Sequence, residues 1–319
     1  MVSFDGQVVV VTGAGRGIGR AHALALAQRG ATVVVNDLAA EHADDVVARI
    51  KDLGGTASAS YRSISSPDEA AAVVADALER HGTVDAVVNN AGFMRNAPFE
   101  QQTPQTLAAM LDVHLVGPFF LTQAAWPIFR EKGYGRVVMT SSAGGMFAMG
   151  GQPNYAAAKA AVYGLAKALA FEGRPHGILV NTVLPHATTE VRHHDPALAG
   201  DPARAAAEQA WAAGHGSHFK PGLREAIAPL RRPEAISPFV VFLASRACTV
   251  TGEAFAVGCG RVARVFVGET RGWATDPAGI SVDDVEANLD RIRSTDDYGI
   301  PENLYEEIEY MARSIGCWS

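Results

Sequence analysis

The sequence predicts an α/β fold in which helices cover both faces of a parallel, doubly wound sheet. Short runs rich in β-branched residues alternate with longer helical patterns through the first 185 residues, which is typical of successive βαβ units. The runs are nearly continuous in apolar residues, as expected for strands that are buried on both faces. The predicted strands are residues 7–12, 31–36, 56–61, 84–89, 136–140 and 178–183.

The segments between these strands carry signals of helix starts. Ser66 precedes Pro67, and Thr103 precedes Pro104. A capping hydroxyl followed by proline at the first helical position is a common N-terminal pattern. Residues 153–171 predict another helix. Residues 233–245 predict a helix before a last strand, 254–257, that closes the sheet.

Two segments lie outside this alternation. Residues 186–232 are polar and rich in alanine, histidine and glycine, which predicts a mobile substrate lid containing some helix. Residues 261–319 carry few periodic signals beyond helices at 282–292 and 301–315. We therefore expect one domain over residues 1–260 and a C-terminal extension over 261–319, which contacts either the substrate or another subunit.

The composition disfavours several classes of protein. No apolar stretch approaches the ~20 residues of a membrane helix, and the N-terminus runs into a strand without a signal or lipidation pattern, so we expect a soluble, cytoplasmic protein with no membrane partner. A formal net charge of −7 disfavours nucleic acid as a partner. The cysteines show no CxxC spacing, which argues against a disulfide framework or a zinc site; they are Cys248, Cys259 and Cys317.

A glycine-rich turn, TGAGRGIG at residues 12–19, follows the first predicted strand and opens a helix. Glycines there allow the backbone to approach a pyrophosphate, whose charge faces the N–H groups at the helix start. The second strand leads into Asp37, whose carboxylate can bind the adenosine ribose hydroxyls and repel a 2′-phosphate. We therefore expect NAD, although Arg16 could pair with the phosphate of NADP. The predicted contacts in the turn are Gly13, Arg16, Gly17, Ile18 and Gly19.

A candidate catalytic group follows from Tyr155 and Lys159, which lie four residues apart and so on one helix face. A nearby lysine cation lowers the pKa of tyrosine, which makes it a general base toward an alcohol or an acid toward a carbonyl. Lys159 can also bind the nicotinamide ribose. Ser142, after the fifth strand, can polarise the substrate oxygen. A surface tyrosine–lysine pair is the alternative, but the glycine turn, Ser142 and NNAG at 89–92 together favour catalysis.

These motifs in this order resemble the short-chain dehydrogenase/reductase family over residues 5–260. The resemblance implies a Rossmann-type sheet of seven parallel strands and catalytic roles for Ser142, Tyr155 and Lys159. It also implies a homodimer or homotetramer, formed through the helices that follow the fourth and fifth strands. The NNAG motif would lie beside the cofactor through Asn90, Ala91 and Gly92.

A closer resemblance is carried by stretches such as VHLVGPF (113–119), YGRVVMTSSAGG (134–145) and FEGRPHGILVNTVLPHA (171–187). These are similar to the (3R)-hydroxyacyl-CoA dehydrogenases of peroxisomal multifunctional enzymes and to actinobacterial relatives that act on acyl-CoA or steroid substrates. The similarity extends into the tail through VGCGRVARV and DDVEANLDRI. It implies a bulky, hydrophobic or CoA-linked alcohol as the substrate.

The chain departs from the family pattern at His114. The family commonly has an asparagine there, which holds a water in a proton relay to the lysine. We expect His114 either to act in this relay or merely to pack near the sheet. Ser63 replaces an acidic residue that often meets adenine, while Ile64 can still pack against the base.

A second departure follows the sixth strand, where Pro185-His186 replaces the usual Pro-Gly. Pro185 can flank the nicotinamide, and Thr188 or Thr189 can bond its carboxamide. Histidines in the predicted lid could suggest a metal, but they show no HExxH spacing and no cysteine partner, so we expect none. They are His193, His194, His215 and His218.

The leading hypothesis is a reversible oxidation of a secondary alcohol to a ketone, with NAD accepting the hydride. An NADPH-dependent ketone reductase is an alternative within the enzyme class because of Arg16. A noncatalytic dinucleotide-binding regulator is an alternative of another class, suggested by His114 and the altered turn at His186.

Overall fold

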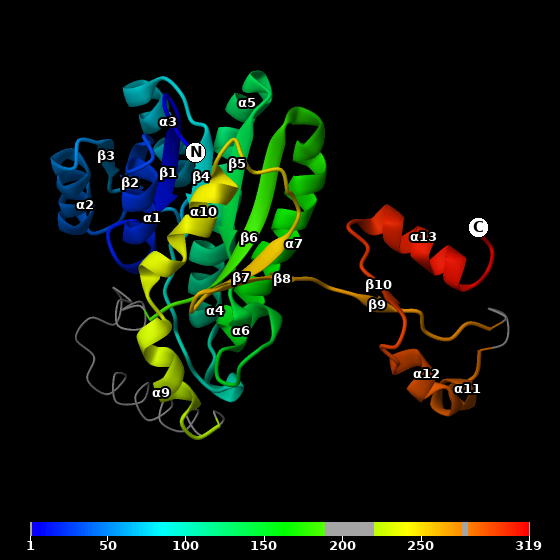
Figure 1. The fold of residues 1–319 in the computed structure, drawn as a ribbon. Helices are drawn as coiled ribbons and strands as arrows, with labels where there is room; N and C mark the ends of the chain where they lie inside the picture. The colour runs from blue at the N-terminus through cyan, green and yellow to red at the C-terminus, as the bar shows by residue number, and fades with distance from the viewer. Residues whose placement is uncertain (1, 189–219, 276–279, 319) are drawn as a thin grey trace. The chain divides into compact units, whose positions relative to one another are not determined.

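The computed structural model describes residues 2–188, 220–275 and 280–318. Its contacts divide the chain into two compact units, Met1–Arg264 and Val265–Ser319, which are described in turn. The first unit is built on an eight-stranded sheet in the order β3-β2-β1-β4-β5-β6-β7-β8 (Figure 1). The strands are β1 (Val8–Thr12), β2 (Thr32–Asn36), β3 (Thr56–Ser60), β4 (Ala86–Asn89), β5 (Gly135–Thr140), β6 (Ile178–His186), β7 (Ala254–Gly258) and β8 (Arg261–Val265).

The pairings from β3 to β7 are all parallel, which confirms the predicted α/β class. All seven expected parallel strands are present, and β8 adds an eighth strand beside β7. Cys259 and Gly260 join the two strands with φ angles of 52° and 75°. Two consecutive positive φ values are typical of a two-residue hairpin turn, so β8 runs back antiparallel to β7. The first unit therefore extends beyond residue 260.

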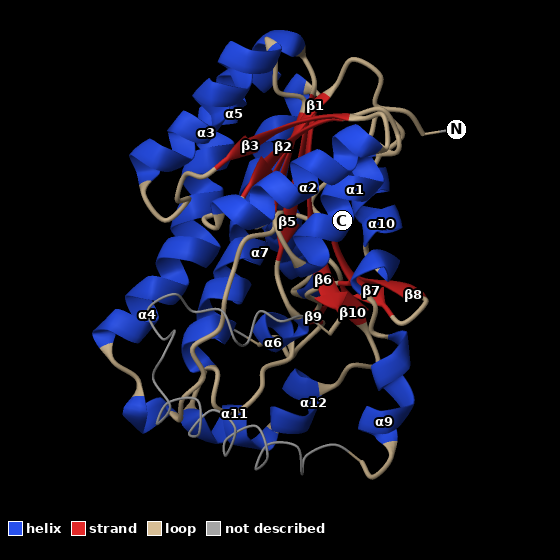
Figure 2. Cartoon of the chain, turned by 90° about the vertical axis from the view of Figure 1, so that its left-hand side faces the viewer, coloured by secondary structure: helices blue, strands red, loops and turns tan. Residues whose placement is uncertain are grey.

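Six main helices cover the sheet: α1 (Gly17–Ala27), α2 (Ala40–Asp52), α3 (Pro67–His81), α5 (Gly117–Lys132), α7 (Pro153–Gly173) and α10 (Ser237–Ala244). Val9 and Val11 of β1 lie in a buried cluster with residues of α1, α2 and α10. Val8 and Val10 lie in a second cluster with α3, α5 and α7. Successive side chains of a strand point to opposite faces, and helices accordingly flank the strands on both sides (Figure 2).

The predicted helix starts agree with the structure. Pro67 is the first residue of α3, although the hydroxyl of Ser66 makes no capping hydrogen bond. Thr103 caps α4 (Pro104–Leu111), where its Oγ1 accepts a hydrogen bond of 3.2 Å from the N–H of Thr106. The helix predicted over 153–171 continues two residues further, to Gly173. The segment 233–245 begins as a 3-10 turn, η8 (Pro233–Ala235), before α10.

A long helical segment joins α4 to α5 through one π-helical turn, η2 (Asp112–Val116). The combined segment Pro104–Lys132 has 29 residues and is long and apolar enough to cross a membrane by length and composition. The expectation that no segment approaches this length is therefore wrong. In the fold, Leu121, Ala125 and Phe129 of α5 are buried in the second core cluster, so the apolar character of α5 serves packing on the sheet.

The second unit contains a two-stranded antiparallel sheet of β9 (Glu269–Thr270) and β10 (Tyr298–Gly299). The helix predicted over 282–292 is interrupted at Asn288, between α11 (Val282–Ala287) and α12 (Leu289–Arg293). The helix predicted over 301–315 is α13 (Leu304–Ser314), which starts later because the Asn303 side chain caps it and accepts hydrogen bonds from two backbone N–H groups.

Candidate active site

The glycine turn after β1 packs directly against the end of β4. Gly13 has a φ of 60°, and a Cβ there would lie 2.7 Å from Ala91 Cα. A Cβ on Gly19 would lie 2.1 Å from the carbonyl oxygen of Gly13 and 2.5 Å from Asn90 Nδ2. Gly17 also has a positive φ, of 51°. The turn therefore tolerates only glycine at these positions, because the backbone itself forms the surface.

Asn90 and Ala91 hold this turn in place. Their backbone N–H groups both donate to Thr12 Oγ1 at 3.0 Å. The Asn90 side chain donates to the carbonyl oxygens of Thr12 and Gly13, at 2.9 and 3.2 Å. Asn90, which the sequence places beside the cofactor, thus supports the loop that would bind it.

The N-terminus of α1 fits an anionic group. Arg16 is its N-cap residue, and its side chain makes no capping hydrogen bond. The first N–H groups of a helix have no partner within the helix and carry partial positive charge. Ile18 follows in the first turn and packs partly against the first core cluster. Together with the glycine turn, this helix start fits a dinucleotide pyrophosphate.

Asp37 lies directly after β2, beside the glycine turn. Its Oδ2 accepts a hydrogen bond of 2.9 Å from the N–H of Gly15, and its Oδ1 accepts one of 3.1 Å from Ala39. A Cβ on Gly15 would lie 2.8 Å from Asp37 Oδ2 and 2.7 Å from His42 Cβ. Asp37 therefore places a negative charge next to the turn, which disfavours a second anionic group there.

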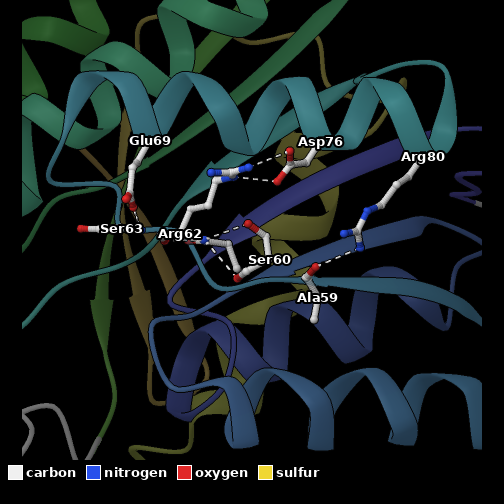
Figure 3. Close-up of polar contacts among 8 residues, drawn as sticks. Ala59, Ser60, Arg62, Ser63, Glu69, Asp76 and Arg80 are labelled. Carbon is white, nitrogen blue, oxygen red and sulfur yellow. Dashed lines mark hydrogen bonds and ion pairs between the residues drawn. The ribbon is translucent and has the colours of Figure 1, made fainter.

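The segment after β3 is fixed by polar contacts that the sequence did not indicate (Figure 3). Arg62 forms a bidentate ion pair with Asp76 of α3, with N···O distances of 2.7 and 3.1 Å. The carbonyl oxygen of Arg62 accepts a hydrogen bond of 2.9 Å from Asn36 Nδ2, at the end of β2. The N–H of Ser63 donates to Glu69 at 2.6 Å, and Ile64 is buried. Ser63 and Ile64 are therefore held close to the strand end that precedes Asp37.

The structure brings Ser142, Tyr155 and Lys159 together. Ser142 caps α6 (Ala143–Met146), where its Oγ accepts a hydrogen bond of 3.1 Å from Gly144. A Cβ on Gly144 would lie 3.5 Å from Ser142 Oγ and 3.7 Å from Tyr155 Cε1. A Cβ on Gly145 would lie 2.8 Å from Lys159 Cβ. The two glycines of α6 thus let it lie against α7, which carries Tyr155 and Lys159.

Lys159 is a buried cation within the site. Its Nζ donates to the carbonyl oxygen of Thr140, at the end of β5, over 2.6 Å. The same atom lies 5.8 Å from the centroid of the Tyr155 ring. Burial lowers the pKa of Lys159 to about 7, because removing water disfavours the charged form. Lys159 can therefore change its charge near neutral pH, next to a tyrosine.

His114 belongs to the same group, although it comes from the π-helical turn η2. Its ring lies edge-to-face on Tyr155, with 5.3 Å between the ring centroids. Its Nε2 lies 2.8 Å from the carbonyl oxygen of Phe93. A carbonyl can only accept, so Nε2 carries the hydrogen and Nδ1 is left as an acceptor. Nδ1 is buried and has no hydrogen-bond partner among the described residues.

The environment of His114 keeps it neutral. Burial, with the charge of Lys159 adding to it, lowers the pKa of His114 well below its usual value. Gly92 makes room for the ring, since a Cβ there would lie 2.3 Å from His114 Cε1. The glycine of NNAG is therefore required by His114, a link that the two separate motifs did not reveal.

Other predicted residues lie near the end of β6 or outside the described part. Pro185 is half-buried at the end of β6. The N–H of Thr188 donates to the carbonyl oxygen of Arg231 at 2.7 Å. Thr189 and the histidines of the predicted lid lie outside the described residues. Sequence reasoning missed Gln152, which is buried next to Gly144 and whose Nε2 has no partner among the described residues.

The parallel sheet, the glycine turn and the Ser142–Tyr155–Lys159 group define a dinucleotide-dependent oxidoreductase. A family model described as short chain dehydrogenase matches residues 7–196. The chain belongs to the short-chain dehydrogenase/reductase family.

Individual relatives agree with this assignment. A short-chain type dehydrogenase/reductase of Mycobacterium tuberculosis is 38% identical over 83% of this chain and 86% of the relative. The peroxisomal multifunctional enzyme type 2 of Mus musculus is 39% identical over 82% of this chain, which spans only 33% of that enzyme. A 7α-hydroxysteroid dehydrogenase, solved in complex with NADH and 7-oxo glycochenodeoxycholic acid, is also similar in structure.

That solved structure superposes with a TM-score of 0.67 and 29% sequence identity, covering 81% of this chain and 95% of the other.

Proposed function

We propose that this chain is an NAD-dependent dehydrogenase that interconverts a secondary alcohol and a ketone. The observation that carries the proposal is the grouping of Ser142 Oγ, the Tyr155 ring and Lys159 Nζ at the carboxyl ends of parallel strands, where ligands of such sheets bind. The glycine turn and the N-terminus of α1 lie at the same edge.

Each side chain has a separate role in this reaction. Ser142 donates a hydrogen bond to the substrate oxygen and orients it. Tyr155 takes the hydroxyl proton in the oxidative direction and returns it in the reductive direction. The ammonium group of Lys159, 5.8 Å from the centre of the Tyr155 ring, stabilises the phenolate. When bound, the dinucleotide supplies the nicotinamide that exchanges hydride with the carbinol carbon.

His114 contributes as a positioning residue and as an acceptor. Its ring packs on Tyr155 and limits the orientations of the phenol. Its buried Nδ1 has no hydrogen-bond partner among the described residues, so it can accept a hydrogen bond from a bound water. Such a water would give a route for a proton between the site and Lys159, which is the role proposed for His114 in the relay.

The mechanism is tested by Tyr155→Phe. Removing the hydroxyl should lower kcat by at least ~100-fold, the usual size of general acid–base catalysis, while the Kd for NADH changes less than about twofold. Turnover close to that of the wild type would contradict the assignment of Tyr155. A wild-type protein that binds NADH but turns over no alcohol or ketone would favour the noncatalytic regulator instead.

Asp37 carries the proposed preference for NAD. Its carboxylate next to the glycine turn would repel the 2′-phosphate of NADP, whereas Arg16 is the feature that favours the NADPH-dependent alternative. Asp37→Ala should therefore lower the ratio of kcat/KM for NAD over NADP by tenfold or more. Asp37→Asn is the control that keeps the shape but loses the charge. A ratio unchanged in both variants would contradict this role.

The substrate side of the site favours a bulky, hydrophobic alcohol. Phe147 is 68% exposed after α6, and Phe99 is 80% exposed in the turn η1 (Phe99–Gln101). The two segments are linked, because the N–H of Ala97 donates to the carbonyl oxygen of Gly151 at 3.0 Å. We propose 3-hydroxyacyl-CoA or steroid-type substrates. The resemblance of the sequence to (3R)-hydroxyacyl-CoA dehydrogenases supports the first class, and the similarity to a 7α-hydroxysteroid dehydrogenase solved with 7-oxo glycochenodeoxycholic acid supports the second. A panel of hydroxyacyl-CoAs, hydroxysteroids and simple alcohols, assayed with both cofactors, tests this.

A further inference from the structure

Three basic residues gather where β6 and β7 end and β8 begins, away from the Ser142–Tyr155–Lys159 group. His186 ends β6 and pairs in register with Gly258 of β7. The two-residue turn Cys259–Gly260 then brings Arg261 to the start of β8. The strands β6, β7 and β8 are neighbours in the sheet (Figure 1), and only two residues separate Arg261 from Gly258, the register partner of His186.

Arg231 joins this group from the segment that precedes α10. Its guanidinium donates to the carbonyl oxygen of Ala187 at 3.0 Å, and its own carbonyl oxygen accepts from the N–H of Thr188 at 2.7 Å. These two bonds tie Arg231 to the chain directly after His186. At Gly258, a Cβ would lie 2.7 Å from His186 Cβ, so glycine is what allows β6 and β7 to approach here.

The positive charges of Arg231 and Arg261 are not balanced by an acidic side chain among the described residues. The chain as a whole has a formal net charge of −7, yet neither Arg231 nor Arg261 forms an ion pair with any described residue. Arg264, three residues further along β8, does pair with Glu253, at 3.5 Å. Partial burial, together with the charges of Arg231 and Arg261, lowers the pKa of His186. The three groups are therefore close enough for electrostatic repulsion between them, and a bound anion would relieve this repulsion.

The place of this group relates it to the substrate. Ser142 follows β5, the neighbour of β6. Strands are spaced by about 4.8 Å, so β8 lies roughly 14 Å across the sheet from β5. We propose that His186, Arg231 and Arg261 bind an anionic group of the substrate, at the far end from its hydroxyl carbon. This inference rests on the proposed function and adds that the substrate is elongated and carries a phosphate or a carboxylate.

Paired substrates test the proposal and distinguish the two kinds of anion. A 3-hydroxyacyl-CoA is compared with the uncharged N-acetylcysteamine thioester of the same acid, and a hydroxysteroid carboxylate with its methyl ester. R231Q and R261Q should each lower kcat/KM about fivefold or more for the charged member, mainly through KM, and less than about twofold for the uncharged one. R264Q is the matched control on β8, and it should leave kcat/KM unchanged for both the charged and the uncharged substrate. An equal loss on both members of each pair would overturn the proposal.

A binding measurement separates this proposal from the proposed function. Inorganic pyrophosphate is titrated into the NADH-saturated protein by calorimetry. We expect binding by the wild type and by R264Q, and binding at least about fivefold weaker in R231Q and R261Q. If the protein binds pyrophosphate but turns over no substrate, the anion site is supported and the proposed dehydrogenase reaction is refuted. If the wild type does not bind pyrophosphate, the anion site is refuted. A loss of NADH affinity in R261Q would also refute it, because Arg261 would then bind the cofactor and not the substrate.

Discussion

His22 gives a quantitative test of how burial in this fold affects stability. It lies on α1, is fully buried, and its Nδ1 is 2.9 Å from Ser237 Oγ at the start of α10. Its Nε2 has no partner among the described residues. Burial lowers the pKa of His22 from 6.5 to about 3. The folded state thus keeps a neutral imidazole at pH values where the unfolded chain is protonated.

The size of the effect follows from this difference in pKa. Each pKa unit corresponds to about 1.4 kcal/mol. The stabilisation is complete above pH 6.5 and decreases as the pH falls toward 3, because only the unfolded state binds the proton in that window. At pH 5, 1.5 units below the unfolded value, the free energy of unfolding should be about 2 kcal/mol lower than at pH 8 on account of His22 alone.

Urea unfolding of the wild type and of His22→Asn at pH 8, 7, 6 and 5, at one protein concentration, measures this contribution. Asparagine retains a polar side chain but does not titrate. The carboxylates and other histidines affect both proteins alike, so the difference between the two proteins isolates His22. The wild type should lose about 2 kcal/mol more than the variant between pH 8 and pH 5. Equal losses within about 0.5 kcal/mol would refute the reasoning.

Two further outcomes are expected at the site. Gly92→Ala places a Cβ 2.3 Å from His114 Cε1, so it should displace the ring, lower kcat at least about tenfold and destabilise the fold by about 1–3 kcal/mol. Gly164→Ala, where a Cβ meets nothing within 4 Å, is the control for kcat and urea unfolding, and equal behaviour of the two would count against the contact. Lys159→Met should abolish turnover without lowering the free energy of unfolding at pH 7, because burial disfavours the ammonium form. A loss of more than about 1 kcal/mol in urea unfolding would show that the bond to Thr140 outweighs this burial cost.

Much of the fold is readable from local patterns. The valine-rich runs, the Pro67 and Thr103 helix starts, and the glycine turn each depend on residues close together in the chain. The seven parallel strands follow from the family resemblance, whereas their order, β3-β2-β1-β4-β5-β6-β7, comes from the structure. The added strand β8 did not follow, because its turn depends on Cys259 adopting a positive φ, which a non-glycine residue rarely does.

The class of fold, the glycine turn and the tyrosine–lysine pair are predictable from the amino-acid sequence alone, because strand periodicity and a four-residue helical spacing are short-range properties. The surroundings of these motifs are visible only in the folded chain. The tertiary structure placed His114 on Tyr155 and against Gly92, paired Arg62 with Asp76, and put Gly258 in register with His186. These contacts join residues that are distant in the chain, so their geometry depends on how helices pack on the sheet and on strand register, which no local pattern encodes.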